Sequence, residues 1–406
     1  MAQSGERQFD VVVMGATGFT GRLVANYLLN EYGTDGPVRW AIAGRNESKL
    51  KTVATELGKA DLAIIVADSH DAAALDALAA QTKVVCSTVG PFAVHGSELV
   101  AACARAGTHY CDITGEVQWV RAMIDDHEAT AKQSGARIVH CCGFDSIPSD
   151  LGTFFMHRHL QRNGQKLKRV GFRINKMKGA LSGGTIASMM NIIDEAKKSR
   201  DLRRLLSDPY ALNPKGEREG PDGRDQMGAR FDETAQSWTA PFIMAAVNTR
   251  IVRRTNALLD YPYGHEFGYD ESTLMGKGLP GRARATAFSA AIGAFMGGAA
   301  FSPTRALLDI VLPSSGDGPD EAAREAGFYD IKLFAETQSG DIVVGRVKGD
   351  RDPGYGSTCK MLGESAVCLA MGEASLPGGS WTPASAMGDA LIDRLTRRAG
   401  LSFEVA

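Results

Sequence analysis

The feature that most constrains this chain is a buried strand that breaks into a glycine-rich turn and continues as a helix. The stretch VVVMGATGFTGRL, residues 11–23, opens with three consecutive valines, which predict a fully buried strand. Apolar residues then recur at helical spacing. Gly15, Gly18 and Gly21 therefore lie where the strand turns into the helix. Such a turn can hold a pyrophosphate against the helix N-terminus, which predicts a dinucleotide site.

The second predicted strand, VRWAIAGR, indicates which dinucleotide is bound, because it ends in Gly44 and Arg45. NAD sites carry an acidic residue about here to bind the ribose 2′-hydroxyl. Arg45 can instead form a forked contact with a 2′-phosphate, and Lys49 can assist from the next helix. The pattern favours NADP(H), although Arg45 could simply begin a solvated helix.

Four further strand-and-loop units follow within the first 150 residues. Strands are expected in LAIIVAD, KVVCSTVGPF, HYCDITGE and ARIVHCCGFDSIPSD, with helices over 71–80, 96–106 and 117–134 between them. This alternation predicts an α/β fold with a Rossmann-type parallel sheet and ligands at the carboxyl ends of its strands. We expect Asp68 beside the adenine, and Thr88, Gly90 and Pro91 to approach the cofactor.

Composition limits the function classes. A length of 406 residues predicts more than one domain. A formal net charge of −2 argues against a general nucleic-acid binder. Seven cysteines without a C-x-x-C spacing indicate a reducing compartment and no metal site. The polar start, MAQSGERQFD, lacks the apolar segment of a signal peptide, which favours the cytoplasm.

The second half predicts an α+β domain with a mostly antiparallel sheet. A strand in KRVGFRINKMKG precedes a helix over 185–197, and a hairpin turns at Ser339 and Gly340. Thr382 and Pro383 predict a capped final helix. We expect an NADP-binding domain over 1–150, a substrate or dimerisation domain over 151–358 with a mobile polar loop at 207–237, and C-terminal helices over 359–406 that return to the first domain.

Six motifs together carry a family resemblance: GATGFTG, AGR, TVGPF, GFDSIPSD, NTRIVRR and TPASAMGDALIDRL. They resemble the saccharopine dehydrogenase-like oxidoreductases, and within these most closely the trans-acting enoyl reductases of mycobacteria. The resemblance runs from Phe9 to Leu395 and implies a dinucleotide fold, a second α+β domain and NADP(H) use. It implies cofactor contacts at Gly15, Thr17, Gly18, Phe19, Gly21, Arg45 and Gly90.

Enoyl reduction needs hydride at Cβ, stabilisation of the thioester oxygen and a proton at Cα. Tyr110, Asp112 and Asp145, in loops after the later strands, are the candidate catalytic residues. For Tyr110 and Asp112 a buried hydrogen-bonded pair is an alternative, and Asp145 could instead cap a helix.

Two segments bear on partners. Arg250, Arg253 and Arg254 share a helix face, which is either a solvated face or a phosphate site for phosphopantetheine or an acidic carrier protein. The uncharged stretch 285–304 contains G-x-x-x-G and leaves three interpretations: a buried or oligomer-interface helix, contact with a membrane surface or acyl chain, or a membrane-spanning helix.

These observations predict an NADPH-dependent oxidoreductase that reduces an enoyl or acyl substrate in trans, as a small molecule or on an acyl carrier protein or polyketide synthase. We expect a homo-oligomer, cytoplasmic or peripherally membrane-associated. Two alternatives remain: an amino-acid or imine oxidoreductase of the saccharopine type, and a nucleotide-binding, lipid-associated scaffold without turnover.

Overall fold

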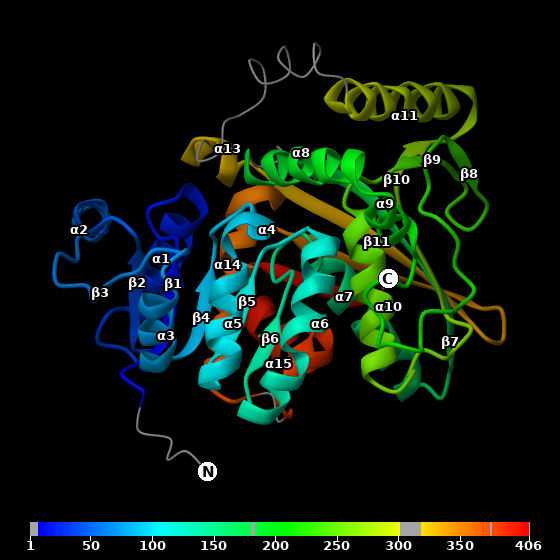
Figure 1. Cartoon of the computed structure of the whole chain (residues 1–406). Coiled ribbons are helices and arrows are strands. Elements are labelled where there is room, and N and C mark those ends of the chain that lie inside the picture. Colours follow the sequence, from blue (N-terminus) through cyan, green and yellow to red (C-terminus); the bar gives the residue numbers. More distant parts are fainter. Residues whose placement is uncertain (1–6, 180–182, 301–317, 374–375, 406) are drawn as a thin grey trace. The chain divides into compact units, whose positions relative to one another are not determined.

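The computed structural model describes residues 7–179, 183–300, 318–373 and 376–405. These residues form two compact units, each with its own seven-stranded sheet (Figure 1). Of the described residues, 7–147, Gly318, 354–373 and 376–400 belong to the first unit. The second unit contains residues 148–179, 183–300, 319–353 and 401–405.

The sheet of the first unit is parallel throughout, as predicted. Its strands lie in the order β13 (Gly379–Trp381), β6 (Arg137–Val139), β5 (His109–Asp112), β4 (Thr82–Ser87), β1 (Phe9–Met14), β2 (Trp40–Gly44) and β3 (Ile64–Val66). All six residues of β1 are buried, which explains the apolar run from Val11 to Met14. The order reverses at β1, so the β1–β4 boundary is the switch point where dinucleotides bind in such sheets.

The helices of this unit confirm the predicted alternation. They are α1 (Phe19–Tyr32), α2 (Glu47–Glu56), α3 (Ala72–Gln81), α4 (Phe92–His95), α5 (Ser97–Ala106), α6 (Val117–Ser134), α14 (Thr358–Ala370) and α15 (Pro383–Arg398). The predicted cap of α15 is present, with the Thr382 hydroxyl accepting from the Ser385 backbone N–H. A π-helical turn, Pro353–Ser357, precedes α14.

Late residues of the chain complete the first unit. Helix α14 packs on β1, β4 and β5, and β13 pairs with β6. Within the unit, Glu364 of α14 is fully buried and accepts hydrogen bonds from the hydroxyls of Tyr27 and Tyr32, at 2.8 and 2.7 Å. Arg394 of α15 binds the same carboxylate at 2.9 Å. A buried charge held by these three donors ties α14 and α15 to α1.

The second unit contains a mixed, mostly antiparallel sheet. Its order is β14 (Leu401–Val405), β12 (Ile342–Gly349), β11 (Phe328–Thr337), β7 (Leu167–Lys178), β10 (Gly268–Gly276), β9 (Ser237–Pro241) and β8 (Arg230–Asp232). The predicted hairpin is β11–β12, and β7 and β10 form the parallel pair. The helices are α7 (Ile147–Arg162), which begins at the boundary, α8 (Gly183–Lys198), α9 (Arg200–Ser207), α10 (Ala245–Leu258), α11 (Gly278–Ala300) and α13 (Glu321–Glu325).

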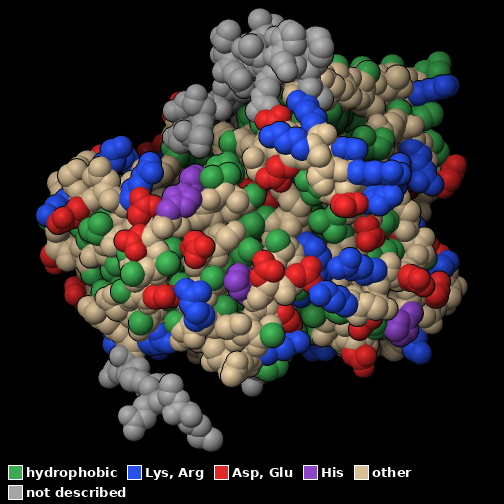
Figure 2. Space-filling model, in the orientation of Figure 1, with side chains coloured by type: hydrophobic (Ala, Val, Ile, Leu, Met, Phe, Trp, Pro, Cys, Tyr) green, Lys and Arg blue, Asp and Glu red, His purple; other side chains and the backbone are tan. Residues whose placement is uncertain are grey.

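Helix α11 corrects the interpretations of the apolar stretch, of which residues 301–304 lie outside the described part. It packs mainly against β9 and β10, yet most of its side chains are exposed, including Phe288 and Met296, so it is not a buried core helix. Figure 2 shows hydrophobic atoms at the surface along the helix, at the upper right. No helix of the described residues is long and apolar enough to cross a membrane, so the spanning interpretation is wrong for this part.

Candidate cofactor site and active site

The glycine-rich turn lies at the carboxyl end of β1, as predicted. Gly15 has φ of +92°, a left-handed conformation that favours glycine, and a Cβ there would lie 2.7 Å from Thr88 Oγ1. A Cβ on Gly21 would lie 2.2 Å from the Gly15 carbonyl oxygen. Gly18 differs, because its Cβ would meet only that same oxygen, at 3.3 Å. Two glycines therefore close the turn, and Gly18 leaves its outer side open at the start of α1.

The loop after β4 lies beside this turn. Thr88 donates through its backbone N–H and its hydroxyl to the Met14 carbonyl, at 3.0 and 3.2 Å. Gly90 and Pro91 are half-exposed and joined by a cis peptide bond. The buried carboxylate of Glu116 accepts from the backbone N–H groups of Phe92 and Ala93, at 2.8 and 3.0 Å. Glu116 thus holds the start of α4, and with it the loop.

The end of β2 presents Arg45 to solvent. Its side chain is exposed and has no hydrogen bond or ion pair with any residue that the structure describes. No carboxylate follows Gly44 within the next two positions, and the Asn46 side chain instead caps α2 by accepting from the Lys49 N–H. Asp68, at the end of β3, is half-buried and accepts from the His70 N–H at 3.0 Å.

These residues fit the phosphates of a dinucleotide. The space beside Gly18 is what a Cβ would fill, and it lies at a helix N-terminus, where backbone N–H groups and the helix dipole favour an anion. Phe19, also predicted to contact the cofactor, packs its ring on Tyr355, with centroids 4.7 Å apart. Thr17 is half-exposed on the same turn. The exposed guanidinium of Arg45 is available to a phosphate.

Asp112 and Tyr110, expected in a loop, are instead both fully buried within β5. Asp112 Oδ1 accepts from the backbone N–H groups of Thr114 and Cys141, and Oδ2 lies 2.7 Å from His140 Nδ1. Burial, together with the Asp112 carboxylate, raises the pKa of Tyr110 far above its usual value. The contacts of Asp112 favour a positioning role for this residue. His140, which follows β6 directly and is 2% exposed, was not predicted from the sequence.

Asp145 lies in the loop after β6 and is half-buried. Loss of solvent around the carboxyl group, and secondarily repulsion from Asp112, raise its pKa to about 8. Its Oδ2 accepts from the Gly143 N–H at 3.3 Å. A Cβ on Gly143 would lie 2.4 Å from Asp145 Oδ1, so glycine leaves room for the carboxyl group. A carboxylic acid that stays protonated at neutral pH can donate a proton.

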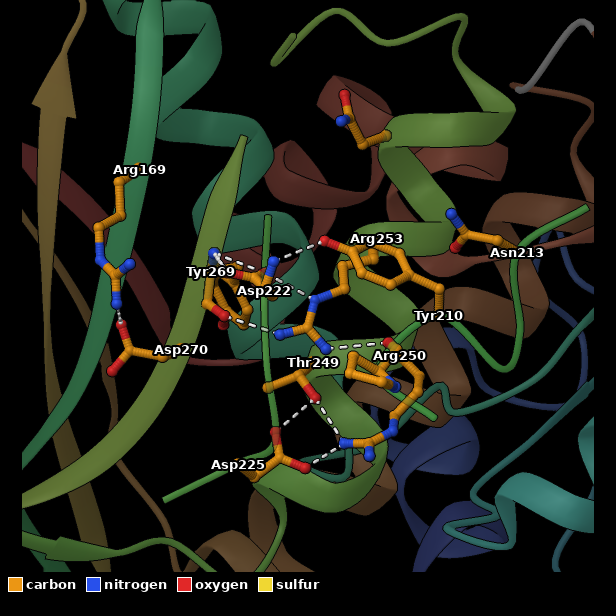
Figure 3. A network of polar contacts seen from close by, with 12 residues as sticks. Arg169, Tyr210, Asn213, Asp222, Asp225, Thr249, Arg250, Arg253, Tyr269 and Asp270 are labelled. Atoms are coloured by element: carbon orange, nitrogen blue, oxygen red, sulfur yellow. Dashed lines mark hydrogen bonds and ion pairs between the residues drawn. The ribbon is translucent and has the colours of Figure 1, made fainter. Parts of the chain in front are cut away.

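The arginines of the NTRIVRR motif correct both sequence interpretations. Arg250, Arg253 and Arg254 are at most 4% exposed, so they form neither a solvated face nor an open phosphate site. Figure 3 shows Arg253 bound to Asp222 at 2.8 Å, and Arg250 in contact with Asp225. Arg250, Arg253 and Arg254 also donate to the carbonyls of Leu206, Pro209 and Leu212 respectively.

The same contacts bear on the loop predicted at 207–237. Its residues 208–229 have no regular helix or strand, but β8 forms within the predicted range. Tyr210 is buried, and its hydroxyl accepts from the Asp222 N–H at 3.1 Å. The Asp222 carboxylate also accepts from the Tyr269 N–H. Buried ion pairs therefore fix this segment to α10 and β10, where a freely moving polar loop was expected.

Comparisons with known proteins agree with this geometry. The family described as "Saccharopine dehydrogenase NADP binding domain" matches residues 11–139. A Mycobacterium tuberculosis protein, provisionally named a trans-acting enoyl reductase, is 42% identical over 98% of this chain and 97% of its own length. The trans-acting enoyl reductase of Mycobacterium ulcerans is 38% identical over 97% of this chain and 96% of its own length.

The chain belongs to the saccharopine dehydrogenase-like family of oxidoreductases. The family assignment and the glycine-rich turn make it an NAD(P)-binding oxidoreductase. Saccharopine dehydrogenase (L-Glu forming) of Saccharomyces cerevisiae has a similar fold, with a TM-score of 0.51 over 98% of this chain and 99% of that one. The two share 14% sequence identity, so this likeness concerns the fold alone.

Proposed function

We propose that this member of the saccharopine dehydrogenase-like family reduces the double bond of an enoyl thioester with NADPH, on an acyl chain that another enzyme or a carrier protein holds. The observation that carries the proposal lies along the carboxyl edge of the parallel sheet. The glycine-rich turn follows β1, and Arg45 follows β2. Asp145 follows β6 on the other side of the switch point, and its pKa of about 8 keeps the carboxyl group protonated at neutral pH. The names of the full-length relatives support the substrate class.

The residues along that edge have three roles: they bind the cofactor, donate a proton and position the loops. Gly18 and the start of α1 would hold the pyrophosphate, and Arg45 would contact the 2′-phosphate. When bound, the nicotinamide would supply a hydride for Cβ of the enoyl group, and the resulting thioester enolate would need a proton at Cα. Asp145 gives its proton to Cα and regains one from solvent. Asp112 holds the loop after β6 through the Cys141 N–H. Glu116 holds the loop after β4.

The experiment is a turnover assay with purified full-length protein. Loss of NADPH absorbance is followed with an enoyl thioester of N-acetylcysteamine and with the same chain on an acyl carrier protein. We expect saturated product with both and faster turnover on the carrier. The saturated thioester, which has no double bond, is the control. Turnover of an amino acid with a 2-oxo acid, and none with enoyl thioesters, would contradict the proposal. NADPH binding without turnover of either would favour a scaffold.

Helix α11 is the segment we propose for contact with a lipid or acyl chain, since Phe288, Met296 and Leu279 are 44, 38 and 79% exposed. A homo-oligomer stays a prediction. Replacing Phe288 and Met296 with Ser tests the lipid contact and the homo-oligomer in one experiment. Lower liposome flotation with an unchanged molar mass in light scattering supports the lipid contact. A halved molar mass would instead place an oligomer interface there.

A further inference from the structure

Two histidines meet at the corner of the first unit where the ends of β2 and β3 lie near helix α4. His70 Nε2 lies 3.0 Å from His95 Nδ1, and the rings meet edge to face with centroids 5.1 Å apart. His70 comes just before α3, and His95 ends α4. Nothing in the proposed mechanism uses either histidine.

The pair is held in place by backbone contacts. The His70 N–H donates to Asp68 Oδ1 at 3.0 Å, and Asp71 caps α3 by accepting from the Ala74 N–H. The His95 N–H donates to the Pro91 carbonyl at 3.1 Å, in the same loop that Glu116 anchors. At the neighbouring strand ends, the Ala67 N–H donates to the Gly44 carbonyl at 3.0 Å. The ends of β2, β3 and α4 thus form one corner.

The charged groups that act on His95 come from each of these segments. Burial lowers the pKa of His95, and His70 and Arg45 lower it further, whereas Asp68 raises it. The Arg45 guanidinium is therefore close enough to oppose a second positive charge. His70 is exposed and His95 is half-exposed, so both rings are open to a ligand at this corner.

We propose that the hydrogen-bonded pair His70–His95 forms, with Arg45, the site that binds the adenosine 2′-phosphate, and that the pair takes up one proton when the phosphate binds. This inference rests on the proposed NADPH binding. A dianionic phosphate beside Arg45 replaces repulsion of a histidine cation with attraction, which raises the histidine pKa. The hydrogen bond joins two ring nitrogens, one of which must be unprotonated, so the pair holds at most one added proton.

The sign of the pH dependence follows from this uptake. The bound state holds a proton that the unbound state lacks, so the histidine contribution to NADPH affinity increases as the pH falls through the pKa of the bound pair. NADH, which has no 2′-phosphate, should show no such contribution. The phosphate's own second ionisation, near pH 6, acts in the opposite sense. The histidine contribution is therefore measured as a difference between variants at one pH.

The test measures Kd for NADPH and NADH by calorimetry with the full chain, at about pH 6 and about pH 8. The variants are His70→Gln and His95→Gln, and the control is His127→Gln on α6, away from this corner. At the lower pH we expect wild type to bind NADPH about tenfold more tightly than either histidine variant, because the variants lack a charge-assisted contact. At the higher pH the Kd values for NADPH should agree within about threefold. NADH affinity and melting temperature should match the control.

A second readout is proton uptake, obtained from the binding enthalpy in two buffers of different ionisation enthalpy. We expect wild type to take up close to one proton more than His95→Gln at the lower pH. If the pair variants match wild type in NADPH affinity and proton uptake while NADPH still binds, this inference is overturned and the proposed function stands. If wild type fails to bind NADPH at either pH, both are overturned.

Discussion

Glu116 Oε1 accepts a hydrogen bond from the backbone N–H of Phe92 at 2.8 Å, at the point where helix α4 begins. The second carboxylate oxygen accepts from the next N–H, so one fully buried side chain fixes the loop after β4 from the loop after β5. A single acidic residue thereby joins two neighbouring loops at the carboxyl edge of the sheet.

Glu116→Gln should loosen the loop that contains Gly90 and Pro91. The amide nitrogen cannot accept from a backbone N–H, so one buried donor is left without its partner, at a cost of about 1–3 kcal/mol in the free energy of unfolding. We also expect weaker NADPH binding, because the loop loses its fixed position. Urea unfolding and calorimetry measure the two effects. Glu98→Gln, on the exposed part of α5, is the matched control and should change neither.

Gly18→Val and Gly21→Ala should separate cofactor binding from folding. Gly18 has φ of −79°, and a Cβ there would meet only the Gly15 carbonyl oxygen, at 3.3 Å, so valine is compatible with the backbone conformation but occupies the predicted position of the pyrophosphate. We expect NADPH binding to be lost with a nearly unchanged melting temperature. Gly21→Ala places a Cβ against the Gly15 carbonyl and should lower stability by about 1–3 kcal/mol. Intact binding by a folded Gly18→Val protein would exclude the turn as the phosphate site.

Arg45→Asp should reverse the cofactor preference. The change removes the guanidinium and places a carboxylate where NAD sites have one. We expect NADPH affinity to fall by about 100-fold or more, because a charge-assisted contact is replaced by repulsion, while NADH binds at least as well as before. Calorimetric titration with both cofactors measures this. Arg105→Asp, which alters an exposed ion pair with Asp76 on the same unit, controls for net charge.

Asp145→Asn should abolish the step that needs a proton at Cα. General acids contribute about 10²–10⁴-fold, so kcat should fall by that range while the NADPH Kd is unchanged. In wild type, kcat should decline as the pH rises above about 8, where Asp145 loses its proton. The variant should lack this decline. An equal decline of kcat in Asp145→Asn would assign the ionisation to another group. The control is Asp126→Asn, at an exposed position on α6.

The same aspartate should affect stability in a defined direction. Its pKa of about 8 in the folded state exceeds the ordinary value of 3.8, so between these values the folded state holds a proton that the unfolded state has released. Stability therefore falls as the pH rises from about 4 to about 8. Asp145→Asn removes this loss, so the variant should gain melting temperature relative to wild type as the pH rises. Thermal unfolding at several pH values measures the difference.

Asp222→Asn should release the segment that α10 holds. The carboxylate is paired with Arg253 and also accepts from the Tyr269 N–H, and Arg253 is 4% exposed. Removing one partner of a buried pair leaves a desolvated charge and should cost about 3–5 kcal/mol. Urea unfolding measures the loss, and limited proteolysis should cut within 208–229. Asp201→Asn, whose partner is the exposed Arg204, should have no measurable effect.

Local patterns predicted the first unit well, because its signals are short-range. Three valines before a glycine-rich turn specify a buried strand and a helix start, and Thr382 with Pro383 specifies a cap. Strand β13 was not predicted, since three residues carry too little pattern and depend on β6 for their pairing. The site was predicted where residue type alone identifies the chemistry, as at Arg45.

The sequence could not reveal which distant residues neutralise a buried charge. The spacing of Arg250, Arg253 and Arg254 identifies a shared helix face. It does not identify the aspartates, more than twenty residues earlier, that pair with Arg250 and Arg253. The same limit applies to His70 and His95, which are 25 positions apart and meet only through the fold. For the uncharged stretch that begins at residue 285, composition alone could not distinguish a covered helix from an exposed one.

The first unit is built from an early and a late part of the chain, which has a consequence for folding during synthesis. Strands β1 to β6 leave the ribosome long before α14, which packs on three of them, and before β13, which pairs with β6. During that interval the emerging sheet has an unpaired edge and an apolar surface without its helix, the state from which nascent chains aggregate. The first unit, although its first strands are encoded early, is therefore completed only after α14, β13 and α15 have been made, and a fragment ending before residue 354 should not yield a stable nucleotide-binding protein.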